Sequence, residues 1–231
     1  MYIQKFIKGI SGEDTRGLSW ADARQWLDRD TGIQSNWLRG VKHGVFQPSD
    51  VVPELTDHKL DRHLHDYDNF GHRSPFISLA SGCIERDALL GANFMYSAKD
   101  TALDFATHAF EHPGTLFYGW VIVGLNPAVD LSAVAESVRD LNVYHRWSRY
   151  QLEGEITAKI HIPANQIERI EWWDPASDTS APTDVYENPQ YAPPRRLPIC
   201  GSTSDGSPAR STDGHPAPHR LPASTRRGAK P

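Results

Sequence analysis

The stretch that decides the fold is RYQLEGEITAKIHIP, residues 149–163. From Glu155 to Ile162 its side chains alternate strictly between polar and apolar. Such alternation predicts a β-strand with one buried face and one polar face. Residues two apart on a strand share a face, with Cα atoms about 6.5 to 7 Å apart. The sequence therefore predicts that Glu153 and Glu155 point the same way, with the register fixed by burial of the aliphatic face.

Two carboxylates at this separation suit chemistry at a glycosidic carbon. The transition state is oxocarbenium-like, so positive charge develops where a carboxylate can stabilise it. Mutual repulsion also pushes the two pKa values apart, which leaves one carboxyl group able to transfer a proton. Exposed glutamates are common on solvated strands, however. The pair gains weight only through other motifs in the chain.

Composition limits the classes of function. The 231 residues are 39% hydrophobic and 23% charged, as in a soluble globular protein, and the net charge of −5 gives no general attraction to nucleic acid or anionic membranes. No apolar run approaches the roughly 20 residues of a membrane-spanning helix. The first residues also lack the pattern of a secretory signal, which predicts a cytoplasmic protein or an effector that is delivered without such a signal.

Residue types divide the chain into two parts. From about residue 175 onward Pro, Ser, Thr, Gly, Ala and Arg dominate. Such a segment buries too little apolar surface to offset its ordering entropy. The sequence predicts one folded domain over residues 1–175 and a disordered tail over residues 176–231.

Periodicity and turn residues give the elements within the folded domain. Ser19, with Asp22 three residues later and Gly32 as a stop signal, predicts a short helix. The remaining predicted elements are a strand at 36–41, a polar loop to 73, a strand within 74–82, a helix at 97–112, a buried strand at 115–125, a short helix at 131–142, and a hairpin of 155–162 with 167–173. This order predicts an α+β fold with a mostly antiparallel or mixed sheet.

Three motifs occur in a recognisable order. WLR at 37–39, SPFISLASG from residue 74 and YQLEGEITAKIHIPANQIERIEWW from residue 150 resemble the Arg, Ser and Glu-x-Glu signatures of the cholera-toxin-like mono-ADP-ribosyltransferases. The resemblance spans residues 36–173. It implies a split two-sheet β-sandwich with flanking helices that binds NAD as a substrate. The implied reaction transfers ADP-ribose and releases nicotinamide.

The resemblance also implies roles for single residues. Glu155 would grip the nicotinamide ribose and stabilise the oxocarbenium ion, and Glu153 would orient or deprotonate the acceptor. Arg39 would hold the pyrophosphate or the adjoining ribose, which suits a guanidinium that forms bidentate, charge-assisted hydrogen bonds. Ser74 would hold the catalytic carboxylate in position.

The serine motif departs from the family pattern. Pro75 and Phe76 replace its threonine and second serine. Alternation places Ser78 on the face of Ser74, where it either substitutes for the missing hydroxyl or bonds within the sheet. Phe76 either stacks on the nicotinamide ring or fills the core.

Three functions follow from these patterns. The first is transfer of ADP-ribose to a protein acceptor, namely arginine, by a monomeric enzyme. The alternatives are an NAD glycohydrolase that uses water, and a non-catalytic module of the same fold that binds a nucleotide or a partner. Residues 57–72 hold four histidines and four aspartates, but their spacing matches no zinc pattern, so a polar loop without metal is expected.

Overall fold

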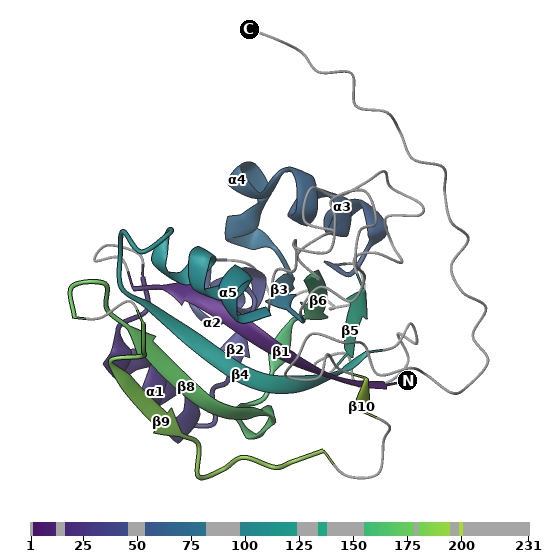
Figure 1. The fold of residues 1–231 in the computed structure, drawn as a ribbon. Helices are drawn as coiled ribbons and strands as arrows, with labels where there is room; N and C mark the ends of the chain where they lie inside the picture. The colour runs from purple at the N-terminus through teal and green to yellow at the C-terminus, as the bar shows by residue number, and fades with distance from the viewer. Residues whose placement is uncertain are drawn as a thin grey trace, which may run out of the picture.

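The computed structural model describes residues 2–12, 17–45, 54–81, 98–123, 134–137, 155–177, 180–194 and 199–200. Its centre is an antiparallel pair of strands, β1 (Tyr2–Ser11) and β4 (Gly114–Val123), each of ten residues. They pair along their whole length (Figure 1). The apolar run predicted as a buried strand is β4, and Leu116 and Phe117 in it are fully buried.

The strands form one large sheet and one small sheet. The large sheet has eight strands in the order β10-β1-β3-β6-β5-β4-β8-β9, with β1 and β4 also paired to each other, and β2 pairs with β7 separately. Most pairs are antiparallel, and β1–β10 and β4–β5 are parallel. The other strands are β2 (Ile33–Gln34), β3 (Phe76–Ala80), β5 (Val134–Ser137), β6 (Glu155–Lys159), β7 (His161–Ile162), β8 (Ile167–Trp173), β9 (Asp184–Glu187) and β10 (Ile199–Cys200). The α+β expectation is confirmed, although these pairings alone do not separate two stacked sheets of a sandwich.

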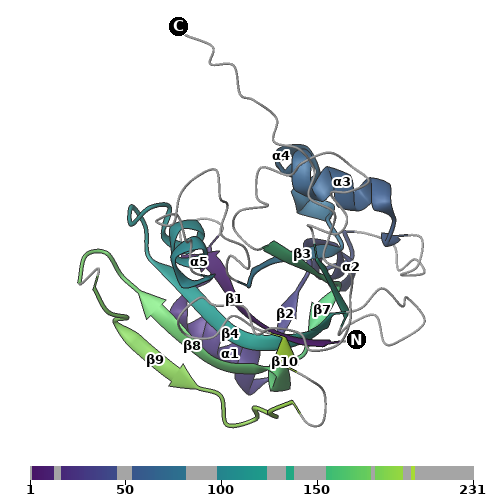
Figure 2. The ribbon, with the colours of Figure 1, turned by 45° about the vertical axis from the view of Figure 1, so that its right-hand side comes forward.

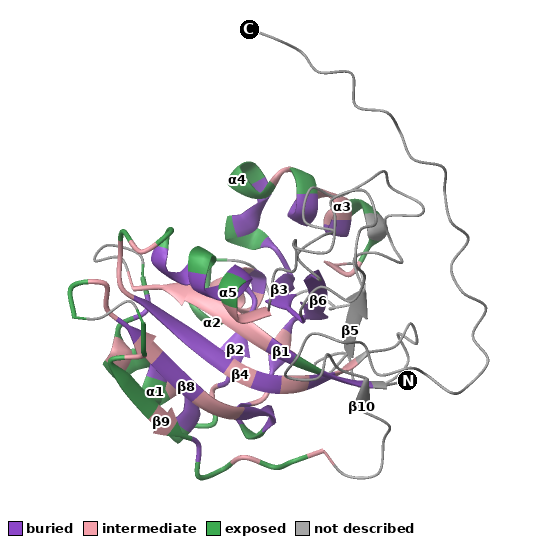
Figure 3. Cartoon of the chain, in the orientation of Figure 1, coloured by how far each residue is buried: buried purple, intermediate pink, exposed green. Residues whose placement is uncertain are grey.

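Two helices cover opposite faces of the β1–β4–β8 region (Figure 1). In α1 (Trp20–Asp28) the Ser19 hydroxyl accepts a hydrogen bond from the Asp22 backbone N–H, as the capping pattern predicts. In α5 (Ala98–Thr107) the backbone packs closely on two glycines, because a Cβ at Gly9 or Gly114 would lie 2.0 or 2.3 Å from a helix carbonyl oxygen. Figure 3 shows that buried residues lie along β4 itself, between these helices.

A second group of helices lies near β3 (Figure 2). It comprises α2 (Asn36–Lys42), α3 (Asp57–His65), α4 (Tyr67–Phe70) and the short 3-10 helix η2 (Gly71–Arg73). The prediction of a strand at 36–41 is therefore wrong, as is the polar loop through residue 73. Side-chain caps favour the helices, since Ser35 Oγ accepts from Leu38 N and Thr56 Oγ1 accepts from Lys59 N.

The predicted hairpin is also wrong, and so is the helix at 131–142, since Val134–Ser137 form strand β5. Strand β6 pairs with β3 and β5, whereas β8 pairs with β4 and β9. The alternation breaks at Ile160, which has a φ of +62°, an unusual conformation for a β-branched residue. Its N–H donates to Pro75 O at 2.7 Å and its carbonyl accepts from Ser35 N at 2.8 Å. This kink directs the chain into β7, which pairs with β2, and then into the 3-10 helix η5 (Ala164–Gln166).

Ordered structure continues past residue 175, within the segment predicted to be a disordered tail. Strand β9 pairs with β8, and buried Asn188 Nδ2 donates to the carbonyl oxygens of Ala164 and Ile167 at 2.8 and 2.7 Å. Strand β10 pairs with β1. The folded part therefore extends beyond the predicted boundary, and residues 201–231 lie outside the described ranges.

None of the helices described is long and apolar enough to cross a membrane.

Candidate functional site

The candidate site lies on one face of the β3–β6 pair. In this pair Ala80 is opposite Glu155, Ser78 is opposite Thr157, and Phe76 is opposite Lys159. Because paired residues share a face, and every second residue along a strand returns to that face, these six side chains form one face of the pair. The other face is apolar and belongs to the main core, through Ile77, Leu79, Ile156 and Ala158. The predicted aim of Glu155, away from the aliphatic face, is confirmed.

Glu155 is the first residue of β6 and is 9% exposed. It lies within electrostatic reach of Lys8 on β1. Burial lowers the pKa of the half-buried Lys8 to about 8, while the Glu155 carboxylate raises this pKa and the positive charge of Arg39 lowers it. The structure thus gathers one carboxylate and two cations from β6, β1 and α2.

Arg39 reaches this region from a helix and not from the strand that the sequence predicts. Its side chain is exposed, and Nη2 donates to the side-chain oxygen of Asn36, one turn earlier. Asn36 Nδ2 in turn donates to Gly71 O at 2.6 Å, and Trp37 N donates to Ser74 O at 2.9 Å. These bonds fix α2 beside the start of β3.

His63 connects the two serines that the sequence singles out. Its Nδ1 is 2.8 Å from Ser74 Oγ and its Nε2 is 2.8 Å from Ser78 Oγ. Ser74 is 1% exposed, and its Oγ also accepts from Phe76 N at 3.1 Å. The hydrogen bonds of the Ser74 hydroxyl therefore go to His63 and Phe76, and not to the Glu155 carboxylate that the family resemblance implies.

The His63 ring is held as a neutral group. It is 4% exposed, and burial lowers its pKa to about 3, with the charge of Lys8 acting in the same direction. The rings of Tyr67 and Phe76 lie 5.4 and 5.8 Å from it, centroid to centroid. At neutral pH the imidazole thus carries one N–H proton, so it donates to one of the two serines and accepts from the other.

Sequence reasoning missed both His63 and Lys8. A signal for His63 exists, because Leu60, His63 and Leu64 have helical spacing and all three are buried. Reading residues 57–65 as a helix places this histidine on the apolar side. Lys8 lies in β1, whose buried residues Ile3, Gln4 and Phe6 do not alternate with polar ones, so no strand was predicted there.

Phe76 is 5% exposed and packs in a small cluster with Leu60 and Leu64. This packing favours the core alternative for Phe76 over stacking on nicotinamide. Glu153, the expected acceptor-side residue, lies outside the described residues.

One hydroxyl on the site face has no hydrogen-bond partner among the described residues. Thr157, directly opposite Ser78, is 1% exposed, and its Oγ1 lacks a hydrogen bond within the described part of the chain. In the same ranges no three His, Cys, Asp or Glu side chains converge as a metal ion would require. The site face therefore offers carboxylate, hydroxyl, imidazole and cationic groups.

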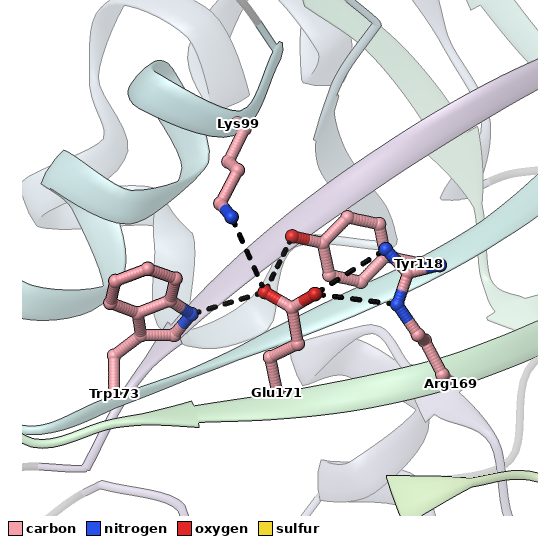
Figure 4. Close-up of polar contacts among 5 residues, drawn as sticks. All are labelled: Lys99, Tyr118, Arg169, Glu171 and Trp173. Carbon is pink, nitrogen blue, oxygen red and sulfur yellow. Dashed lines mark hydrogen bonds and ion pairs between the residues drawn. The ribbon is translucent and has the colours of Figure 1, made fainter. Parts of the chain in front are cut away.

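A second buried carboxylate is that of Glu171 on β8, which is 6% exposed. Figure 4 shows the side chains that surround it. Its Oε2 accepts from Tyr118 Oη at 2.7 Å and from Trp173 Nε1 at 3.2 Å, and lies 3.7 Å from Lys99 Nζ. Its Oε1 accepts from Arg169 Nε and Nη2, both at 3.3 Å. Both carboxylate oxygens are therefore occupied by donors from β4, β8 and α5.

Comparison with known proteins gives limited similarity. No protein-family model matches the chain, and a search of curated proteins finds no significant match. Among solved structures, EcPltA has a TM-score of 0.44 at 14% identity, covering 85% of this chain and 90% of its own. A mutant of the heat-labile enterotoxin A subunit has a TM-score of 0.39 at 13% identity, covering 84% and 81%. Similarity at this level does not bear on function.

Proposed function

We propose that this chain is a mono-ADP-ribosyltransferase. It binds NAD as its substrate, cleaves the bond between nicotinamide and ribose, and transfers ADP-ribose to an acceptor, with protein arginine as the preferred class. The observation that carries the proposal is the position of Glu155. This buried carboxylate heads β6 on the polar face that it shares with Ser78, within electrostatic reach of Lys8, which in turn lies within reach of Arg39.

Glu155 supplies the negative charge that the reaction needs. When the ribose C1′–N bond breaks, both bonding electrons leave with nicotinamide and positive charge develops on the ribose. A carboxylate already in place stabilises that charge without reorganisation, and burial makes the attraction stronger than in water. The 9% exposure of Glu155 fits this requirement.

Lys8 and Arg39 supply the complementary charge for the pyrophosphate of NAD. A guanidinium bonds phosphate oxygens through paired N–H groups, and an ammonium acts as a compact positive charge. With its pKa at about 8, Lys8 is mostly protonated at pH 7. The two cations come from α2 and β1, so the pyrophosphate would lie between these elements.

The acceptor completes the reaction by attacking C1′ as its own proton leaves. We assign Glu153 to orient the acceptor and take this proton. Replacement of Glu153 by Gln is then expected to spare hydrolysis of NAD and to depress transfer to protein. Equal loss of both activities would contradict this division between Glu153 and Glu155.

Release of nicotinamide by the purified full chain tests the proposal. With saturating NAD and either arginine-rich protein or water as acceptor, Glu155→Gln is expected to lower the rate about 10²- to 10³-fold, the range for loss of one such electrostatic contact. Glu111→Gln, an exposed site beyond α5, is the matched control and should keep the wild-type rate.

The same assay separates the alternatives. Release with water alone as acceptor would identify a glycohydrolase. If the wild type releases nicotinamide no faster than Glu155→Gln with either acceptor, the enzyme proposal is wrong and a binding module remains. Circular dichroism of each variant confirms that it is folded.

A further inference from the structure

Four groups form a continuous line of hydrogen bonds beside Glu155. They are the Phe76 N–H, the Ser74 hydroxyl, the His63 imidazole and the Ser78 hydroxyl, with lengths of 3.1, 2.8 and 2.8 Å. The direction in which protons are donated along this line follows from the number of protons that each group carries.

Ser74 is the first side chain of the line. Its Oγ accepts from Phe76 N, and a hydroxyl has one proton to donate. Ser74 is 1% exposed, so this proton needs an acceptor inside the protein. The remaining partner of Oγ within the described part of the chain is His63 Nδ1, at 2.8 Å. Ser74 therefore donates to Nδ1.

The His63 imidazole accepts a hydrogen bond at one nitrogen and donates one at the other. Because Nδ1 accepts a hydrogen bond, it carries no proton, and a neutral imidazole then carries its proton on Nε2. Burial keeps the ring neutral by lowering the pKa of His63 to about 3. Nε2 thus donates to Ser78 Oγ at 2.8 Å.

Ser78 is the end of the line. Its Oγ accepts from His63, so its own proton points elsewhere, and its described side-chain hydrogen bond is the one with His63. Ser78 is half-buried on the face that carries Glu155. The Thr157 hydroxyl, which has no hydrogen-bond partner among the described residues, lies directly opposite at 1% exposure. Within the described residues these two adjacent hydroxyls have bonding capacity that no protein group uses, and an oxygen-rich ligand would supply the polar partner.

We propose that His63 is a positioning residue that fixes the Ser78 hydroxyl as a hydrogen-bond donor to an oxygen of the dinucleotide bound on the Glu155 face. The identity of that ligand rests on the proposed function. The direction of the hydrogen bonds does not, because it follows from the protein's own groups. Ser78, and not Ser74, is then the serine that meets the ligand.

A matched pair of substitutions at His63 tests the direction. The amide nitrogen of Gln lies near the position of Nε2, so His63→Gln retains a donor to Ser78. The amide oxygen of Asn lies near Nδ1, so His63→Asn retains the acceptor for Ser74 and loses that donor. We expect His63→Asn and Ser78→Ala each to raise the KM for NAD about tenfold, the effect of one hydrogen bond, with a smaller change in kcat. His63→Gln should stay within about threefold of wild type.

Substitution of the exposed His65 by Asn is the control and should leave KM unchanged. If the wild type releases nicotinamide but Ser78→Ala and folded His63→Asn both keep the wild-type KM, the inference is wrong and the proposed function stands. Ser78→Ala provides this test even if His63→Asn does not fold.

Nitrogen-15 NMR of the histidine rings in the full chain tests the direction without any assay of activity. The His63 signals are assigned by their loss in His63→Gln. A proton on Nε2 and none on Nδ1 at pH 7 supports the inference, whereas a proton on Nδ1, or on both nitrogens, overturns it. If the wild type releases no nicotinamide, the proposed function fails, and the spectrum still decides the direction of the hydrogen bonds.

Discussion

Glu155 and Glu171 are both buried strand carboxylates, at 9% and 6% exposure, yet their surroundings differ. Both oxygens of Glu171 accept hydrogen bonds from neighbouring side chains (Figure 4). Glu155 shares its face with Thr157, whose buried hydroxyl has no described partner, and with Ser78, whose proton points away from His63. Burial alone therefore does not distinguish a structural carboxylate from a functional one. Under the proposed function, the unused bonding capacity of the groups beside Glu155 is what a bound dinucleotide takes up.

The Glu171 network stabilises the packing of α5 on strands β4 and β8. The Arg169 guanidinium lies over the Tyr118 ring at 3.9 Å, and Lys99 Nζ lies over the Trp173 ring at 4.7 Å. Since Lys99 belongs to α5 and the other residues to β4 and β8, the network fastens the helix to the sheet. Cations stacked on aromatic rings and bonded to one carboxylate are held in place, as a structural role requires.

The largest expected effect is on stability, from Glu171→Ala. Removal of this carboxylate leaves buried donors of Tyr118 and Trp173 without an acceptor, and is expected to lower the free energy of unfolding by about 3 to 5 kcal/mol. Urea denaturation measures the change, with exposed Glu187→Ala on β9 as the control. The folded fraction of Glu171→Ala should release nicotinamide at the wild-type rate. A decrease of less than about 1 kcal/mol in the free energy of unfolding would contradict a structural role for Glu171.

Tyr118→Phe tests one bond of the same network. Loss of a hydrogen bond to a charged group is expected to lower the free energy of unfolding by about 1.5 to 3 kcal/mol at pH 7. Burial and the hydrogen bond to Glu171 raise the pKa of Tyr118 above its ordinary value of 10. Above pH 10 the unfolded chain loses this proton first, so the wild type loses stability as pH rises. The phenylalanine variant lacks this group.

The stability difference between wild type and Tyr118→Phe should therefore shrink above pH 10, as measured by urea denaturation at several pH values. Tyr67→Phe, at a half-exposed tyrosine, is the control for loss of a tyrosine hydroxyl outside the Glu171 network. A difference that is constant with pH would contradict the raised pKa of Tyr118.

Much of the scaffold around these carboxylates was predictable from sequence. The Ser19 cap indicated α1, the apolar run indicated β4, and alternation gave the two faces of β6. These signals are local, because a cap or an alternating face depends on residues that are neighbours in sequence. For the same reason the Glu155 face was predictable and its aim is confirmed.

The parts that failed depend on tertiary contacts. One exception is the short run at 36–41, which fits either a strand or a helix, because the Ser35 cap that decides for the helix α2 is itself a local signal. The hairpin fails because Ile160 takes a positive φ, held by hydrogen bonds to Pro75 and Ser35 that no local pattern shows. Lys8 joins the site only because β1 lies beside β3, and alternation in β1 is broken since neighbouring strands and α5 cover it.

His63 gives the Glu155 region a sensitivity to acid. Its pKa is about 3 in the folded chain against an ordinary 6.5, so between these pH values only the unfolded chain binds the proton. Stability is then lost as pH falls below 6.5, by up to about 1.4 kcal/mol per pH unit. His63→Gln should remove this dependence, so the stability difference between wild type and variant should shrink from pH 7 to pH 5. If the free energies of unfolding of the two proteins instead change in parallel from pH 7 to pH 5, the pKa of His63 is not lowered by burial.

Lys8 gives the smallest expected effect, on activity at alkaline pH. As pH rises through the Lys8 pKa of about 8, the ammonium beside Glu155 loses its charge, and a neutral amine no longer attracts a pyrophosphate. The wild-type kcat/KM for NAD should therefore fall about tenfold between pH 7.5 and pH 9, in proportion to the protonated fraction. Lys8→Arg keeps its charge over this range and should lack that fall. If both proteins lose activity in parallel, the charge of Lys8 does not serve NAD.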